Sequence, residues 1–365
     1  MMTKPLKNSV LLLSPGRSQA RAIANWLKRT GKNFLIVGGN LVKPPRSPAM
    51  KPFQYSVDVK KSSDLDGYQF VIPAGSHSTS FLVDHCGGFR VGKVFFASDN
   101  LRVDDKAWLY DLSQSIGVSV PDTWSEFECI PDDGNSLFYK PRWEGSTGPR
   151  RPAKKKDALP FYVRNSDFIF QEYIPGREVY GFGFIAKSGE PIVTCQHLEI
   201  ASNPLHGGSA VAVFALDNQR IEELSRKLLR ALNYEGWGLV EFKYCHRRKD
   251  FVLMELNAKW WASLEFALRR EPAFGRLLFG IDGVSENLPG LFWPDRYLSS
   301  LRGNLLIGIM TSKQLPWAQS ITPPLFRQIM AGIIPASWAD LYREKKRIMQ
   351  KRVKPGITLH DDIDN

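Results

Sequence analysis

The chain has 365 residues, a length typical of about two or three domains. Hydrophobic residues make up 43% and charged residues 24%, which excludes a wholly disordered or collagen-like chain. Lys and Arg number 49 against 37 Asp and Glu, so the formal net charge is +12. Such an excess of positive charge favours polyanionic partners: nucleotide phosphates, nucleic acid or an anionic membrane surface.

Cysteine spacing and hydropathy restrict the compartment. The four cysteines are widely separated, and none lies in a C-x-x-C motif, which argues against a disulfide framework or a structural zinc site. The early apolar run Val10–Leu13 is too short for a signal peptide, and no segment approaches the ~20 apolar residues of a membrane span. We therefore expect a soluble cytoplasmic protein.

Residues 1–98 predict an α/β unit. Four segments have the composition of buried, parallel strands: Val10–Leu13, Phe34–Val37, Phe70–Ile72 and Val94–Phe96. Apolar residues from Ala20 to Leu27 recur at helical spacing, and Gly38-Gly39 is expected to end the second strand. The first turn lacks G-x-G-x-x-G, so nothing here indicates dinucleotide binding.

Residues 99–283 predict an α+β domain with antiparallel sheets. One helix is expected after Val103, with Gly117 at its end, and another over 219–232, capped by Asp217 or Asn218. The expected strands are Ser136–Lys140, Asp167–Glu172, Glu178–Ala186, Pro191–Gln196, Gly238–Tyr244 and Phe251–Asn257.

Two further segments are strongly basic. Residues 142–156 combine turn-forming Gly and Pro with dense positive charge, which predicts a mobile loop. Residues 284–365 form a basic C-terminal extension, in which Tyr342–Lys354 holds seven Lys or Arg and one Glu. This extension suits either peripheral contact with an anionic membrane or docking on the chain's own α/β unit.

The sharpest chemical feature is the hairpin at 238–257. Alternate side chains of a strand share a face, so four residues are expected to point the same way: Phe251, Leu253, Glu255 and Asn257. If three residues form the turn, Glu241 lies directly opposite Glu255. Two carboxylates so placed among apolar residues repel each other unless a cation lies between them, and with an amide oxygen they suit Mg²⁺. The alternative is an exposed, solvated edge.

Three other segments carry groups that suit a nucleotide. Lys140-Pro141 precedes the small-residue run Glu144–Gly148, whose backbone N–H groups can approach phosphate oxygens. Lys106, on the preceding helix, adds a cation. Residues 171–178 end a strand in Pro-Gly, which leaves backbone groups able to pair with an adenine edge. Taken singly, each segment is better explained as a surface turn or a solvated side chain.

Together, the order and spacing of these motifs resemble the ATP-grasp superfamily. The matching residues are Lys106, Lys140-Pro141 with Gly145-Ser146-Thr147-Gly148, Gln171 to Glu178, and Glu241 with Glu255-Leu256-Asn257. The match runs from about Asp105 to Asp282 and is closest to the carbamoyl-phosphate-synthase-type and carboxylate–amine ligase branches. It implies an ATP-grasp fold with the nucleotide between two antiparallel sheets at 99–283, preceded by a Rossmann-like domain at 1–98.

The resemblance also implies a role for each matching residue. The residues implied to contact the ATP phosphates are Lys106, Lys140, Gly145, Ser146, Thr147 and Gly148. The residues implied to contact adenine and ribose are Gln171, Glu172, Ile174 and Glu178. The implied ligands of Mg²⁺, or of Mn²⁺ in its place, are Glu241, Glu255 and Asn257. Lys259 stands where the family commonly has Arg, and with Arg142 it is a candidate catalytic cation.

The implied reaction is that of an ATP-dependent ligase. A substrate carboxylate attacks the γ-phosphate, and an amine then displaces phosphate from the acyl phosphate, so that an amide, ADP and phosphate are formed. The basic loop 142–156 is the candidate lid that excludes water, or else a solvated run of charge. Two alternatives remain: a phosphotransferase or carbamoyl-type reaction on the same scaffold, and a non-enzymatic basic module that binds nucleic acid or anionic membrane. No nucleic-acid partner is expected, because no motif that reads RNA or DNA is recognisable.

Overall fold

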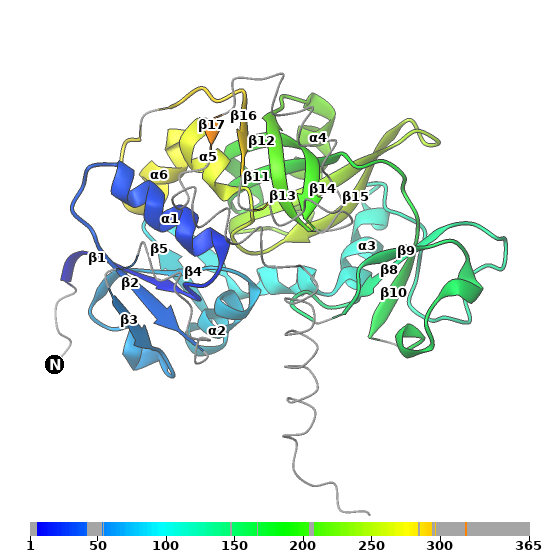
Figure 1. Ribbon diagram of the computed structural model, residues 1–365, viewed down its shortest axis with the longest axis horizontal. Helices are drawn as coiled ribbons and strands as arrows, with labels where there is room; N and C mark the ends of the chain where they lie inside the picture. The colour runs from blue at the N-terminus through cyan, green and yellow to red at the C-terminus, as the bar shows by residue number, and fades with distance from the viewer. Residues whose placement is uncertain are drawn as a thin grey trace, which may run out of the picture.

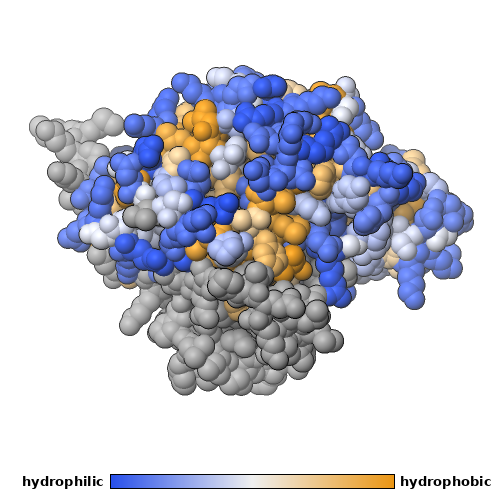
Figure 2. All heavy atoms as spheres, turned by 90° about the horizontal axis from the view of Figure 1, so that it is seen from above, coloured by the Kyte–Doolittle hydropathy of each residue, from blue (hydrophilic) through white to orange (hydrophobic). Residues whose placement is uncertain are grey.

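A computed structural model describes residues 6–41, 53, 55–146, 148–165, 167–203, 208–283, 285–293, 296 and 318–319. These residues form a mixed α/β structure with several sheets. In Figure 1 the N-terminal sheet lies at the lower left, a large sheet at the upper centre and a smaller sheet at the right. Apolar side chains gather near the centre of the face drawn in Figure 2, and hydrophilic residues surround them.

The N-terminal sheet has four parallel strands in the order β3-β2-β1-β4. Its elements are β1 (Leu6–Leu13), α1 (Ser18–Arg29), β2 (Leu35–Asn40), β3 (Tyr55–Asp58), β4 (Tyr68–Pro73) and α2 (Ser76–Cys86). Val10–Leu13 is fully buried, as its unbroken apolar run predicts. The expected strands at Val10–Leu13, Phe34–Val37 and Phe70–Ile72 are therefore confirmed, whereas β3 gave no signal that we recognised.

Two expectations for this unit are wrong. The segment Val94–Phe96 belongs to β6 (Val94–Ala97), which pairs antiparallel with β5 (Gly88–Val91) outside the parallel sheet. Only two residues join β5 to β6, and a parallel connection needs about a dozen. The glycines at 38–39 do not end β2 either; without a Cβ, Gly39 lets the side chain of Leu13 approach closely.

The smaller sheet is antiparallel, in the order β7-β10-β8-β9. Its strands are β7 (Thr123–Trp124), β8 (Leu137–Pro141), β9 (Arg151–Ala153) and β10 (Phe168–Glu172). The edge strand β9 lies within the segment expected to be a mobile loop, so that segment is held at its far end by pairing with β8. Before this sheet, α3 (Lys106–Ser115) begins at Asp105, whose side chain accepts from the N–H of Ala107 at 3.1 Å.

The large sheet has seven strands in the order β15-β14-β11-β12-β13-β16-β17, all antiparallel except the last pair. Its strands are β11 (Val179–Lys187), β12 (Glu190–Asn203), β13 (Ser209–Ala215), β14 (Gly236–Cys245), β15 (Asp250–Asn257), β16 (Gly290–Phe292) and β17 (Ala318–Gln319). The remaining helices are α4 (Gln219–Ala231), α5 (Leu264–Arg270) and α6 (Pro272–Phe279), with 3₁₀ turns at Ser62–Leu65, Ser98–Asp104, Lys156–Ala158 and Phe161–Val163. Asn218 caps α4 by accepting from the N–H of Ile221 at 3.1 Å. Helix α1 packs against α5 and so joins the N-terminal unit to this body.

Two statements about membranes follow from the described residues. None of the helices in these ranges is long and apolar enough to cross a bilayer. The basic segment Tyr342–Lys354, with its expected membrane contact, lies outside the described residues.

Two glycines on β11 let large rings lie flat on the large sheet. A Cβ on Gly181 would stand 2.4 Å from the ring of His197, and a Cβ on Gly183 would stand 2.6 Å from the indole of Trp261. Trp261 is 3% exposed and therefore has little room to move. The sheet surface next to β14 thus depends on bare backbone at these positions.

We expect Gly183→Ala to lower the free energy of unfolding by about 1–3 kcal/mol, because the added methyl group overlaps a fixed indole. Urea-induced unfolding followed by tryptophan fluorescence measures the change. Gly16→Ala is the matched control, since a Cβ there meets nothing within 4 Å. Equal losses in the two variants would contradict the packing argument.

Candidate active site

Two glutamates face each other on the large sheet. Glu241 on β14 pairs directly with Glu255 on β15, so the expected register is confirmed at this point. The side-chain amide of Asn257 donates to both, at 3.1 Å to Glu241 Oε2 and at 2.9 Å to Glu255 Oε1. The amide therefore bridges two carboxylates in the place where a cation was expected.

This register arises from two offsets that cancel. β14 ends at Cys245 and β15 begins at Asp250, so four residues form the turn instead of the expected three. The pairing near the turn is consequently shifted by one residue. Met254 then interrupts the ladder as a β-bulge, and beyond it Glu255 meets Glu241.

The bulge also corrects the expected facing of β15. Phe251 and Leu253 were expected to share a face with Glu255 and Asn257, and this is wrong. Leu253 pairs with Phe242, the strand neighbour of Glu241, and so lies on the opposite face from the carboxylates. Leu253 and Phe242 are both fully buried in the hydrophobic core.

The carbonyl group of the bulged residue joins the two sheets. A bulge leaves its extra residue outside the ladder, and the Met254 carbonyl oxygen accepts from Lys140 Nζ at 3.1 Å and from Tyr110 OH at 2.5 Å. Lys140 Nζ also donates to Tyr110 OH at 2.8 Å. The ammonium group of β8 is thus held beside the carboxylates of the large sheet, and its burial lowers the pKa of Lys140 to about 8.

The two carboxylates differ in how strongly they bind a proton. Burial, together with the charge of Glu255, raises the pKa of Glu241 well above its ordinary value. Burial and Glu144 oppose ionisation of Glu255, but Lys106, a hydrogen bond with Glu241 and Lys140 outweigh them, so that the pKa of Glu255 is lowered. Glu241 is therefore the protonated partner.

The donor set fits a hard divalent cation. Two carboxylates and one amide are oxygen donors of the kind that Mg²⁺ and Mn²⁺ take, and the raised pKa of Glu241 marks negative charge that a cation would neutralise. No group of three or more His, Cys, Asp or Glu gathers as a metal site among the residues that the structure describes. The third donor here is the side-chain amide of Asn257, and asparagine is not one of these four residue types.

Three cations converge on Glu144, in the small-residue segment after β8. Lys106 Nζ lies 3.0 Å from Glu144 Oε2, Lys259 Nζ contacts Oε1, and Arg150 lies 3.9 Å from Oε2. Burial alone would raise the pKa of Glu144, but Lys259 and Lys106 hold it far below its ordinary value. Glu144 is thus an ionised carboxylate that pairs with Lys106, an expected phosphate ligand that is only 2% exposed, and with Lys259, an expected catalytic cation.

Arg142 is turned to a different partner. Its guanidinium donates to both oxygens of Asp105, at 2.8 and 2.7 Å, and Asp105 is also the cap of α3. Of the small residues that follow, Gly145 has a φ of +76° and Gly148 packs against Pro141 and Phe168. Ser146 donates its N–H to the Trp143 carbonyl at 3.4 Å. Thr147 lies outside the described residues.

The expected adenine segment begins at the end of β10. Gln171 is fully buried, donates from Nε2 to Thr123 Oγ1 at 3.0 Å, and leaves Oε1 without a partner. Glu172 forms ion pairs with Arg248, at 2.6 Å, and with Arg247. The first residue of the segment therefore keeps a buried acceptor unused, whereas the second is fully engaged.

The rest of the segment is fixed through its backbone. Lys243 Nζ donates to the carbonyl oxygens of Ile174 and Gly176, at 2.9 and 2.7 Å. Ile174 is 2% exposed, and the exposed Glu178 accepts from the N–H of Arg177 at 3.2 Å. Lys243 lies two residues beyond Glu241 on β14, so a single strand presents both a carboxylate and this anchor.

The structure thus gathers most of the expected site and adds residues that sequence reasoning missed. Glu144, Tyr110 and Lys243 were not expected in it. Glu144 lies inside the small-residue motif and Lys243 alternates with Glu241, so these two positions carried a signal. Tyr110 carried none, because only tertiary packing brings it to Lys140.

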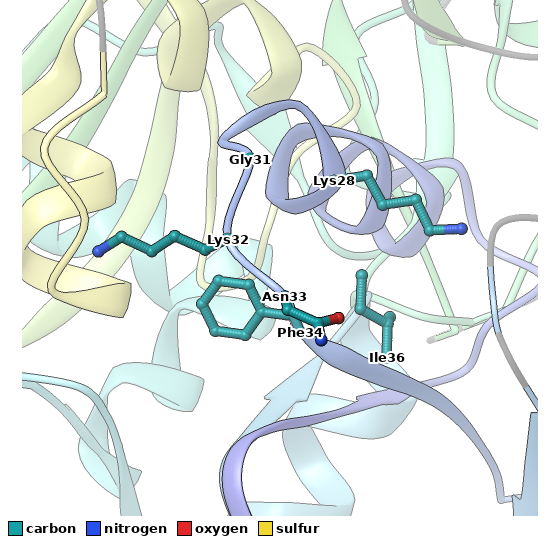
Figure 3. Close-up of a pocket in the computed structure, with 6 residues that line it drawn as sticks. All are labelled: Lys28, Gly31, Lys32, Asn33, Phe34 and Ile36. Carbon is teal, nitrogen blue, oxygen red and sulfur yellow. The ribbon is translucent and has the colours of Figure 1, made fainter.

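Two cavities lie away from these residues. One of about 310 Å³, at the end of α1, is lined by Lys28, Gly31, Lys32, Asn33, Phe34 and Ile36. Figure 3 shows its two lysines extending in opposite directions, so they do not converge on a common ligand. The other, of about 340 Å³, is lined by Gly16, Arg17, Ser18, Gln19, Arg21, Ser209 and Arg296.

No protein-family model matches the sequence, and no curated protein matches it.

Solved structures do resemble this chain. The L-amino acid ligase from Bacillus licheniformis matches with a TM-score of 0.54 and 12% identity, over 76% of this chain and 75% of that one. The N5-carboxyaminoimidazole synthetase from Staphylococcus aureus, complexed with ADP, matches with 0.57 and 12%, over 78% and 80%. The phosphoribosylamine–glycine ligase from Thermotoga maritima matches with 0.55 and 12%, over 76% of each.

The raised pKa of Glu241 predicts how stability depends on pH. The folded-state pKa of Glu241 is raised, so between its unfolded value of about 4.3 and the folded value the native state binds more protons, and stability falls as pH rises. We expect Glu241→Gln to reduce this fall and to leave the free energy of unfolding at pH 8 equal to or above that of the wild type.

Urea unfolding at pH 6 and pH 8 measures this effect. Glu190→Gln is the matched control, because Glu190 is exposed and its pKa is lowered by Arg230. A Glu241→Gln variant that loses stability more steeply with rising pH than the wild type would refute the raised pKa of Glu241.

Proposed function

The chain has the ATP-grasp fold that its motifs predict, and on that premise we propose that it is an ATP-dependent ligase joining a carboxylate to an amine. One observation carries the proposal: Glu241, Glu255 and Asn257 lie opposite a cluster of buried lysines. Anionic ligands and cations placed this closely suit a metal-bound triphosphate.

The proposed phosphate site lies between α3, β8 and the end of β15. Lys106 and Lys140 contact the phosphates, and Glu241, Glu255 and Asn257 hold Mg²⁺ or Mn²⁺. The metal, when bound, neutralises charge on the phosphates as the phosphoryl group moves. Lys259 supplies a compact point charge, which lacks the two-pronged hydrogen bonding of the arginine that the family commonly has there.

The proposed base site lies along 171–178. The unused Oε1 of buried Gln171 is an acceptor for the adenine amino group, and the backbone at Glu172 and Ile174 supplies the remaining polar contacts. Lys243 stiffens this stretch by its bonds to two carbonyl groups. Glu178 is exposed and receives the ribose hydroxyls.

The lid is proposed to be the segment from Glu144 to Arg150. It is tethered at one end by the Arg142–Asp105 ion pair and at the other by β9, which pairs with β8. Gly145, Ser146, Thr147 and Gly148 then close over the phosphates. Arg142 thus acts in this proposal by positioning the lid, and closure protects an acyl phosphate from water.

The reaction proceeds in two displacements. A carboxylate oxygen of one substrate attacks the γ-phosphorus, and the bond from that phosphorus to the β,γ-bridging oxygen breaks to release ADP. The amine nitrogen of the second substrate then attacks the acyl carbon, phosphate leaves, and the nitrogen loses a proton. In this scheme residues 99–283 form the ATP-grasp domain, and the parallel sheet of residues 1–98 is the Rossmann-like domain that precedes it.

The test is a screen of carboxylic acids and amines for ADP release with ATP and Mg²⁺. We expect release that depends on both substrates, and we expect Glu255→Gln to lower it about 100-fold or more while circular dichroism stays unchanged. Glu190→Gln, altered on an exposed part of β12, is expected to match the wild type.

Other results, from this screen or from binding measurements, would favour the alternative functions. ADP release that needs no amine points to phosphotransferase or carbamoyl-type chemistry. Salt-sensitive binding of nucleic acid or anionic vesicles without any affinity for ATP points to a basic binding module. Full activity of Glu255→Gln would contradict the metal assignment.

We also expect Glu144→Gln to tighten ATP binding by about tenfold, equivalent to roughly 1.4 kcal/mol. The wild-type carboxylate competes with phosphate for Lys106 and Lys259, and the variant leaves a buried ammonium group in need of an anion. Calorimetric titration with ATP and Mg²⁺ measures the change. Weaker binding would instead mean that Glu144 holds the lysines in place for the phosphates.

A further inference from the structure

A third buried glutamate lies on the face of the large sheet that carries the acidic pair. Glu199 on β12 is 6% exposed, and its side chain forms no hydrogen bond or ion pair with the described residues. Glu199 is therefore a nearly buried carboxylate whose hydrogen-bonding capacity these residues leave unused.

The neighbours of Glu199 give it nothing to bind. In register across the sheet it lies between Val179 on β11 and Val213 on β13, both apolar. His197, two residues earlier on the same face, is already bonded to Ser263 Oγ at 3.1 Å. Neither flanking strand therefore places a polar side chain directly beside Glu199.

The charges around Glu199 favour a cation. Glu241 and Glu255 both interact electrostatically with it, which adds to the negative potential on this face. Arg296 opposes them, but its guanidinium donates to the carbonyl oxygens of Ala210 and Ala262, at 2.6 and 2.9 Å. Burial outweighs Arg296 and raises the pKa of Glu199 to about 8. A positive group bound beside Glu199 would therefore stabilise its ionised form.

We propose that Glu199 binds the ammonium group of the amine substrate beside the Glu241–Glu255 pair and accepts one proton from it, which frees the nitrogen lone pair for attack. An ammonium group has three hydrogen-bond donors and a full positive charge. These replace the hydrogen bonds with water that the carboxylate loses when it is buried. The row of Gly181 and Glu241 lies one pleat away on the same face, and the ring of His197 lies over Gly181 in that row. This inference rests on the proposed function and names the substrate class of that site.

The test is direct binding of ammonium probes to the full chain. Methyl esters of amino acids carry an ammonium group without a carboxylate, and we titrate a set of them calorimetrically with Mg²⁺ and a non-hydrolysable ATP analogue present. We expect at least one ester to bind the wild type, with affinity about tenfold or more weaker in Glu199→Gln and unchanged in Glu190→Gln. Glu199→Asp, which keeps the charge, is expected to retain part of the affinity.

Each other outcome has a definite reading. Equal affinity of wild type and Glu199→Gln, or no ester bound while the nucleotide analogue binds, overturns the role of Glu199 and leaves the proposed function standing. No binding of the nucleotide analogue to any variant overturns the proposed function, and this inference with it. Thermal unfolding of each variant shows that its fold is intact, so that a loss of binding is not a loss of structure.

Discussion

The structure of the site depends on two carboxylates placed opposite each other inside a sheet. Glu241 and Glu255 cannot both be charged without compensation in a buried setting, and three neighbouring residues supply part of it. Asn257 donates to both, the pKa of Glu241 is raised, and Lys106 and Lys140 lower the pKa of Glu255. The lysines in turn require anions, because each is almost fully buried. Each buried charge of the site is therefore compensated by other groups of the site.

Backbone geometry places this set of charges as much as side chains do. Without the bulge at Met254, the four-residue turn would move Glu255 one residue out of register and onto the other face of β15. The same bulge provides the carbonyl oxygen to which Lys140 and Tyr110 donate. One local irregularity thus aligns the acidic pair and anchors a cation from the other sheet.

The sequence predicts the parts of this arrangement that are local. Periodicity identifies α1, α4 and the hairpin, since these depend on contacts between residues close in the chain. It places Glu241 opposite Glu255, although an incorrect turn length and an unforeseen bulge had to cancel. It fails at Val94–Phe96, where the tight connection after Val91 carries more weight than apolar composition. Tyr110 could not be foreseen, because its partner Lys140 is brought to it only by packing.

On the proposed function, Glu144 links nucleotide entry to loop closure. Lys106 and Lys259 can satisfy either Glu144 or phosphate oxygens, since both anions need the same ammonium groups. When phosphate takes them, Glu144 is released into a segment whose next residue, Gly145, already has the positive φ of +76° that permits a sharp change of direction. The segment is held at its two ends by the Arg142–Asp105 ion pair and by the pairing of β9 with β8. The carboxylate that keeps the lysines paired without nucleotide would thus be the group whose displacement allows the loop to close.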